Sequence, residues 1–168
     1  MPNVIFCDSF DHYSQADSTR KSWLSYNNSS GPVLGQGRNG TAGILCGGGW
    51  VHNIIAGNLT TGYIEIAFKT SSMTVGTGEF DFIQLRDAGT THISVRLAAN
   101  GVLRVVRANS VVLGSTPAPI VLVNVWYHIG LKVKIDDATG EYDLRINGVS
   151  VLSATGVDTR NGANAVFN

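Results

Sequence analysis

Apolar and polar residues alternate with a period of two along most of the chain after residue 60. In the stretch GYIEIAFKT, Ile64, Ile66 and Phe68 fall on one side, and Glu65 falls on the other. Successive side chains of a β-strand point to opposite faces. The stretch is therefore predicted to be a strand with one buried face and one solvated face.

The same alternation recurs on both sides of two Asn-Gly pairs. HISVRLAANGVLRVVR has it around Asn100-Gly101, a dipeptide typical of tight hairpin turns because both residues tolerate positive φ. WYHIGLKVKI and EYDLRI also alternate, and Asn147-Gly148 then starts a turn into a third strand. The residues expected to be buried here are Tyr127, Ile129, Leu131, Val133, Tyr142, Leu144 and Ile146.

The turn DDATGE joins WYHIGLKVKI to EYDLRI. A loop over residues 137–140 would place Lys134 opposite Asp143, a favourable cross-strand pair. It would also place Lys132 opposite Arg145, which is a mild like-charge conflict.

The rest of the chain carries weaker signals. Residues 3–10 are expected to form a short strand, and residues 11–40, which are rich in Ser, Asn and Gly, are expected to be loop. No segment has a long 3.6-residue period, so no long helix is predicted. Many short strands separated by turns predict an all-β fold, an antiparallel sandwich or barrel, in one domain over residues 1–168.

The composition narrows the possible partners. The 168 residues carry 12 basic and 12 acidic side chains, without a cluster of Lys and Arg, so no nucleic-acid partner is expected. No run of 18 apolar residues is present, so no membrane insertion is expected. Cys7 and Cys46 lack metal-ligand spacing and are expected to be reduced, buried thiols.

Three patterns were weighed as cofactor or metal sites. GQGRNG fits the glycine spacing of a dinucleotide-binding loop, but it leads into a strand-like run instead of a helix. The four His residues have no partner at ligand spacing. Asp136 and Asp137 are expected to belong to a turn, because a calcium site needs six or more oxygens. The sequence therefore predicts no cofactor and no metal.

Four stretches together resemble a known family. They are DSFDHY (8–13), GRNGTAGILC (37–46), LAANGVLRVVR (97–107) and VWYHIGLKVKIDDATGEYDLRINGVSVL (125–152). The chain is similar to the concanavalin A-like lectin and glucanase fold in its laminin-G-like form. The opening F-D-H-Y and the G-R-x-G segment more narrowly resemble such domains of tailed-phage virion proteins. The resemblance implies an antiparallel two-sheet jelly-roll sandwich. It leaves the function open, because this fold carries lectins, hydrolases and structural modules.

The stretch GEFDFIQ raises the question of sugar hydrolysis. Hydrolases that this fold resembles carry three acids on one strand, spaced E-x-D-x-E or E-x-D-x-x-E. Glu79 and Asp81 match the first two acids. The third position is Ile83, or Gln84 if a β-bulge near Phe82 adds one residue. Neither Ile nor Gln can protonate a leaving group, so no catalytic residue is predicted.

The same strand offers polar groups for binding a glycan. The candidate carbohydrate-binding residues are Trp50, Glu79, Asp81 and Arg96. Trp50 follows a glycine run, where an exposed ring could stack on a sugar, and packing is its competing role. A plain solvated strand face is the competing role for the two acids. Trp126 is expected to pack at the rim of the sandwich.

The resemblance favours a non-enzymatic structural module located in a virion, as a capsid decoration, tail or fibre protein. Its partners would be other virion proteins or copies of itself, with cell-surface glycans as a further class of ligand. Two alternatives stay open, namely a free-standing carbohydrate-binding lectin and a glycoside hydrolase.

The C-terminal stretch SATGVDTRNGANAVFN supplies only AVF as a last strand that could return beside residues 4–6. The first strand would then keep an open edge, which invites pairing with another chain. The chain is therefore expected to be the N-terminal module of a longer protein, or to have its sheet completed by a neighbouring subunit.

Overall fold

The computed structural model describes residues 57–73 and 78–168 throughout, together with residue 38 and the backbone of four short strands before them. The chain divides into two compact units, residues 1–56 and residues 57–168, and each is described by itself. A single domain over the whole chain stays a prediction.

The described part of the first unit consists of two short antiparallel pairs. β1 (Ser25–Tyr26) pairs with β4 (Val51–His52), and β2 (Ser30–Val33) pairs with β3 (Gly43–Cys46). β3 confirms the strand expected after GQGRNG. β1 and β2 show that the expectation of loop throughout residues 11–40 was wrong. Ser, Gly and Pro have low strand propensity, so pairing with a partner strand, and not local preference, defines these elements.

Several expectations lie outside the described residues. These are the strand at residues 3–10, the redox state of Cys7 and Cys46, and the role of Trp50.

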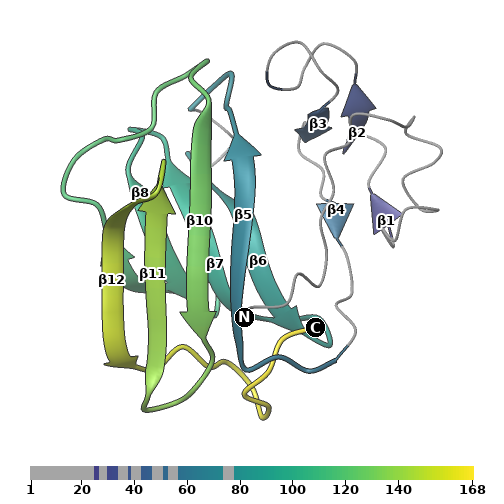
Figure 1. Cartoon of the computed structure of the whole chain (residues 1–168), viewed down its shortest axis with the longest axis vertical. Helices are drawn as coiled ribbons and strands as arrows, with labels where there is room; N and C mark the ends of the chain where they lie inside the picture. Colours follow the sequence, from purple (N-terminus) through teal and green to yellow (C-terminus); the bar gives the residue numbers. More distant parts are fainter. Residues whose placement is uncertain are drawn as a thin grey trace. The chain divides into compact units, whose positions relative to one another are not determined.

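The second unit is a β-sandwich of two four-stranded antiparallel sheets (Figure 1). One sheet has the order β12-β11-β10-β5, and the other has the order β6-β7-β8-β9. The strands are β5 (Thr61–Phe68), β6 (Glu79–Asp87), β7 (Thr90–Ala98), β8 (Leu103–Arg107), β9 (Val111–Ser115), β10 (Tyr127–Lys134), β11 (Gly140–Ile146) and β12 (Val149–Val157). The prediction of an all-β antiparallel sandwich is confirmed.

Side chains from both sheets interlock between them. The ring of Phe68 on β5 stacks on Phe82 of β6, with 4.5 Å between ring centroids. At the other side of the sandwich, Tyr142 Oη on β11 donates a hydrogen bond to the carbonyl of Leu113 on β9 at 3.1 Å. These contacts place β5 against β6 and β11 against β9.

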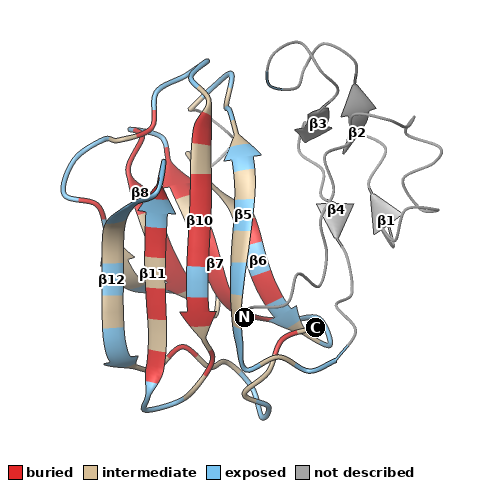
Figure 2. Cartoon of the chain, in the orientation of Figure 1, coloured by how far each residue is buried: buried red, intermediate tan, exposed pale blue. Residues whose placement is uncertain are grey.

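The core lies under the central strands (Figure 2). Every residue predicted to be buried in β10 and β11 is at most 9% exposed, and these residues are Tyr127, Ile129, Leu131, Val133, Tyr142, Leu144 and Ile146. Each fully buried Leu or Ile contributes about 1.5–3 kcal/mol of hydrophobic free energy. β5 and β12, the edge strands of the first sheet, have no fully buried residue.

The expected pairing of β10 with β11 is wrong by two residues. Lys132 pairs with Asp143, and Lys134 pairs with Glu141, so both lysines face acids. The loop begins and ends one residue earlier than expected. The reason is that Asp136 Oδ1 accepts the backbone N–H groups of Ala138 and Thr139, at 2.9 and 2.7 Å. This Asx-type turn ends before Gly140, and the like-charge conflict does not arise.

Both predicted Asn-Gly hairpins are confirmed, but their turns differ. Asn147 and Gly148 both have positive φ, 51° and 84°, as a two-residue type I′ turn requires. At Asn100-Gly101 only Gly101 has positive φ, 83°, and the strands end one residue further away on each side. The carbonyl of Gly101 instead accepts the N–H groups of Ile120 and Val121, so this turn anchors a distant loop.

The C-terminal residues return beside the start of β5. Phe167 and Leu59 exchange two backbone hydrogen bonds, of 2.8 and 3.0 Å. Phe167 is 2% exposed, and its ring occupies the space where a side chain at Gly62 would lie. The expected partner, residues 4–6, lies outside the described residues.

Candidate functional site

Three of the four candidate glycan-binding residues come together on the outer face of the β6-β7-β8 part of the sandwich. Glu79 and Asp81 are two residues apart on β6, so they share a face, and Asp81 is the cross-strand partner of Arg96. Arg96 Nε donates to Asp81 Oδ1 at 2.7 Å, and Arg96 Nη2 donates to Asp81 Oδ2 at 3.2 Å. This is a bidentate ion pair, which fixes both side chains.

A second arginine completes the cluster. Arg104 on β8 is the cross-strand partner of Arg96, and its Nη1 donates to Glu79 Oε1. Arg96 Nη1 lies 3.7 Å from Glu79 Oε2, so acids and arginines alternate. The sequence argument missed Arg104, although the period of two across the Asn100-Gly101 hairpin puts it on the same face as Arg96.

The bulge expected near Phe82 is confirmed. Asp81 pairs with Arg96 and Ile83 pairs with Val95, so Phe82 is the extra residue on β6. The bulge turns Ile83 into the core, where it is 6% exposed.

The same bulge brings Gln84 to the outer face beside Asp81, and Gln84 Nε2 donates to Asp81 Oδ2 at 3.3 Å. The position of a third acid in the hydrolase pattern is therefore held by an amide. Glu79 and Asp81 are 31% and 12% exposed, and each accepts hydrogen bonds from an arginine. The four groups form an ion-pair cluster, and glycan binding by them stays a prediction.

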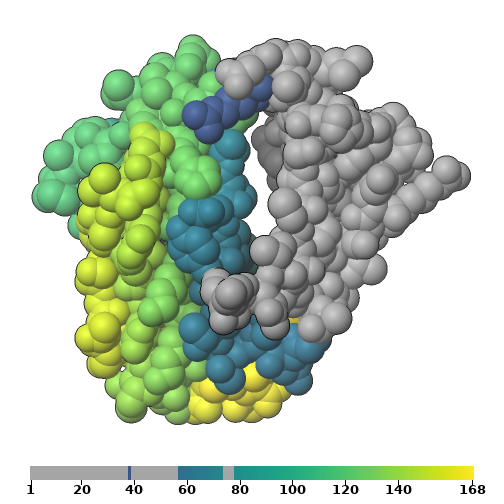
Figure 3. Space-filling view, in the orientation of Figure 1, coloured from purple at the N-terminus to yellow at the C-terminus, as the bar shows by residue number. Residues whose placement is uncertain are grey.

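The outer face of the β12-β11-β10-β5 sheet carries a second polar surface. Its residues belong to the part of the molecule coloured from teal to yellow in Figure 3. The register aligns its side chains in rows across the sheet. One row runs Tyr63, Lys132, Asp143, Ser153, and the next runs Glu65, Gly130, Arg145, Ser150. We call this surface the β5–β12 face.

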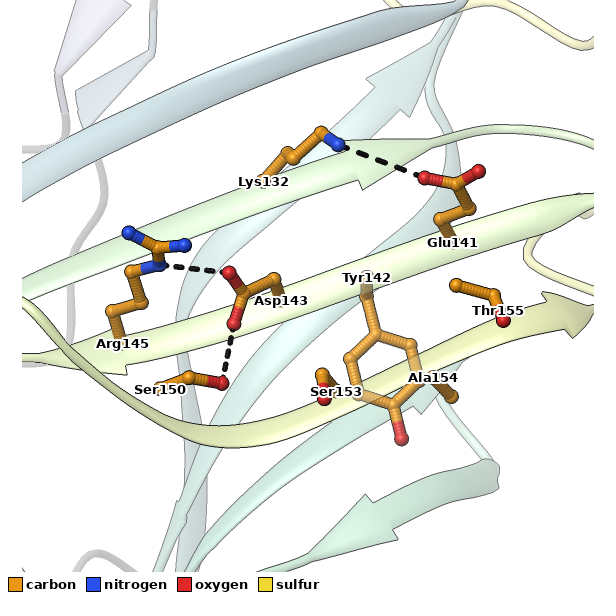
Figure 4. Close-up of a pocket in the computed structure, with 9 residues that line it drawn as sticks. All are labelled: Lys132, Glu141, Tyr142, Asp143, Arg145, Ser150, Ser153, Ala154 and Thr155. Carbon is orange, nitrogen blue, oxygen red and sulfur yellow. Dashed lines mark hydrogen bonds and ion pairs between the residues drawn. The ribbon is translucent and has the colours of Figure 1, made fainter.

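A shallow hollow of about 240 Å³ opens on the β5–β12 face (Figure 4). Arg145 Nε donates to Asp143 Oδ2 at 2.7 Å, and Ser150 Oγ donates to Asp143 Oδ1 at 2.6 Å. Lys132 Nζ lies 3.6 Å from Glu141 Oε2 along the same strands. Burial alone would raise the pKa of Asp143, but the hydrogen bonds from Ser150 and Arg145 lower it overall. The hollow is thus lined by groups of both charges.

The loop at Asp136 and Asp137 is a turn, as expected. The backbone N–H groups of Thr139 and Ala138 lower the pKa of Asp136 to about 2. Asp137 instead pairs with Arg160. Within the described part of the chain, no group of three or more His, Cys, Asp or Glu side chains is arranged to hold a metal ion.

Trp126 lies half-buried at the start of β10, and the ammonium of Lys69 sits 5.1 Å from its ring centroid. This position at the end of the sheet agrees with the expected rim packing, and the cation adds a favourable contact with the ring.

Comparisons with family models, with curated proteins and with solved structures found no match to this chain. The described residues contain no helix of the length and hydropathy that a membrane crossing requires.

Proposed function

We propose that the chain is a non-catalytic jelly-roll module of the concanavalin A-like type, located in a virion, that acts through protein–protein contacts. Its partners are other virion proteins or copies of itself. The F-D-H-Y and G-R-x-G segments, which resemble tailed-phage virion domains, support the location, and the fold of residues 57–168 as an antiparallel sandwich is compatible with it. The observation that carries the contact role is an apolar loop on the surface.

This apolar loop, residues 120–125, is part of the connection between β9 and β10. Leu122 is 61% exposed, Val123 is 45% exposed and Val125 is 41% exposed. Large apolar side chains gathered at one exposed place mark interaction sites, because leaving them in water has a cost that a partner removes.

Hydrogen bonds hold the apolar loop in place. The N–H of Leu122 donates to Tyr127 Oη at 2.9 Å, and the N–H of Asn124 donates to the carbonyl of Thr70 at 2.7 Å. Val121 is 1% exposed and anchors the loop in the core. A loop fixed in this way loses little conformational entropy when a partner binds, which favours association.

The ion-pair cluster supports the non-catalytic part of the proposal. A retaining glycosidase needs a nucleophile and a separate general acid about 5 Å apart with a sugar between them. Glu79 and Asp81 contact arginines, and Gln84 stands where a third acid would be needed. Release of reducing ends from a β-glucan that the substitution Glu79→Gln abolishes would overturn this part.

The contact role is tested by incorporation of variants into particles. Leu122→Asp and Val123→Asp are expected to lower the amount of chain recovered with purified virions by about tenfold or more, because each buries a charge in an interface. Val111→Asp, at a 42% exposed valine of β9, is the matched control and should be incorporated normally. Unfolding midpoints of all three should match the wild type. Normal incorporation of both loop variants would contradict the proposal.

The alternative of a carbohydrate-binding lectin has one observation in its favour. Tyr63 is 51% exposed on β5, the edge strand of the polar β5–β12 face, where an aromatic ring has no packing role toward the core. A glycan-contacting surface is compatible with the contact role, because the two use different parts of the sandwich.

A further inference from the structure

The side chain of Tyr63 lies along the sheet surface and covers Gly130. A Cβ atom at Gly130 would lie 2.5 Å from Tyr63 Oη and 3.1 Å from its Cζ. The Cα partner of Tyr63 is Lys132, so the ring reaches diagonally along β10 toward Gly130. The phenol end of the side chain occupies the space where a side chain at Gly130 would lie, and Tyr63 as a whole is 51% exposed.

A hydrogen bond fixes this arrangement. Tyr63 Oη donates a hydrogen bond to Glu65 Oε1 at 2.5 Å, which holds the ring in place. This hydrogen bond is the main cause of a raised pKa for Tyr63, so the phenol stays protonated at neutral pH. The ring is therefore a fixed, uncharged, flat apolar surface on the exposed side of a sheet.

Hydrogen-bonding groups surround the ring on its β11 side. Arg145 on β11 is the cross-strand partner of Gly130. Lys132 on β10 pairs with Tyr63 on one side and with Asp143 on the other. The hollow of about 240 Å³ is lined by Lys132, Asp143, Arg145 and Ser150, so it adjoins the row that contains Tyr63. Guanidinium, ammonium, carboxylate and hydroxyl groups together offer both donors and acceptors.

The charges on the β5–β12 face balance. Three bases, Lys132, Lys134 and Arg145, stand among three acids, Glu65, Glu141 and Asp143. Such a face does not select for an anion or a cation by long-range attraction. The ligand that fits is uncharged, has an apolar flat side to lie on a ring, and has hydroxyl groups along its edge.

From this geometry we infer that the β5–β12 face binds a neutral glycan, with one sugar ring stacked on Tyr63 and its hydroxyls bonded to Arg145, Asp143 and Lys132. A pyranose has an apolar C–H side and polar edges, which match the ring and the hollow. This inference specifies the glycan-contacting part of the proposed function. It places that site on the opposite sheet from Glu79 and Asp81.

A simpler role for Tyr63 is to cover Gly130 and stabilise the sheet, since an aromatic side chain across from a strand glycine does this. That role affects stability and requires no ligand. The two roles are separated by measuring glycan binding and unfolding on the same variants.

The test uses backbone amide shifts of the full chain, titrated with cellohexaose, mannohexaose and galactohexaose at millimolar concentration. At least one oligosaccharide should shift amides of β5, β10 and β11. Tyr63→Ala should weaken that binding by about tenfold, and Tyr63→Phe, which keeps the ring, should weaken it by less than about threefold. Gly130→Ala, which displaces the ring while keeping it in the chain, should weaken it as much as Tyr63→Ala.

Val112→Ala, at a 50% exposed valine of β9 on the other sheet, is the control and should bind like the wild type. The inference is overturned if none of the three oligosaccharides shifts the amides of this face, or if Tyr63→Ala binds as tightly as the wild type. A negative result for glycan binding would not change the expected particle incorporation of the Leu122 and Val123 variants. The glycan inference and the protein-contact proposal are therefore tested separately.

Discussion

Glycines in the strands of this sandwich mark places where another group comes close. At Gly140 a Cβ atom would lie 2.3 Å from both Thr159 Oγ1 and the carbonyl oxygen of Val157. Gly130 has an equally close neighbour, but that neighbour is the end of the exposed Tyr63 side chain. The difference is whether the neighbour can move, and backbone oxygens cannot.

Gly140→Ala is therefore expected to lower the free energy of unfolding by about 1–3 kcal/mol or more, because the methyl group overpacks fixed backbone atoms. Gly130→Ala is the matched control, with a change of less than about 1 kcal/mol, since Tyr63 can swing into solvent. Urea unfolding measures both. Equal losses of stability in the two variants would contradict the distinction.

Asp136 is expected to make the free energy of unfolding depend on pH in the acid range. Its pKa is lowered from 3.8 to about 2 by the N–H groups of Thr139 and Ala138. A carboxyl group whose pKa is lower in the folded state stabilises fully above its unfolded pKa, and that contribution is lost as pH falls toward the folded value. The loss should occur between about pH 4 and pH 2.

Asp136→Asn keeps an oxygen that can accept the same two hydrogen bonds, but it does not titrate. The difference in unfolding free energy between wild type and Asp136→Asn should therefore shrink as pH falls from about 4 to about 2. Urea midpoints at several pH values measure it. A difference that stays constant over this range would show that the turn does not favour the carboxylate form.

Element by element, the alternation of apolar residues was enough to predict β5, β7, β8, β10, β11 and β12, because side-chain direction in a strand is a local property. The bulge at Phe82 was predictable for the same reason, since Phe80 and Ile83 could not otherwise both face the core. The register of β10 with β11 was not predictable. Asp136 is held by Thr159 as well as by its own turn, and Thr159 is distant in the sequence.

The candidate sites show the same limit of local patterns. Glu79, Asp81 and Arg96 were candidates from the sequence, but their pairing across one hairpin was not predicted. The contact of Tyr63 with Gly130 joins two strands that are far apart in the chain, and no local pattern reveals it. Arg104 could have been found by extending the period of two across the Asn100-Gly101 turn.

Phe167 anchors the C-terminal segment beside the start of β5. Phe167 is 2% exposed and fills the space over Gly62. Phe167→Ala is expected to lower the free energy of unfolding of residues 57–168 by about 3–5 kcal/mol, because it leaves a cavity in the core. Val149→Ala, at a 67% exposed residue, should change it by less than about 0.5 kcal/mol. A small loss for Phe167→Ala would show that the segment is only loosely attached.

At the scale of the whole molecule, the described sandwich has two surfaces of different character. The apolar loop at residues 120–125 offers large exposed apolar side chains, and the β5–β12 face offers a charge-balanced polar surface with one exposed aromatic ring. The first suits a protein partner and the second suits an uncharged polyhydroxylated ligand. The proposed virion module would use the apolar loop to contact neighbouring proteins and the β5–β12 face to bind glycans.

The central claim is that this chain works as an assembly module through the apolar loop, and a structure of the chain within its native particle tests it most directly. The measurement is the surface buried between the chain and its neighbours. We expect more than about 1,000 Å² in total, with Leu122 and Val123 inside the contact. A chain whose apolar loop faces solvent in the particle, with a smaller buried area elsewhere, would contradict the account.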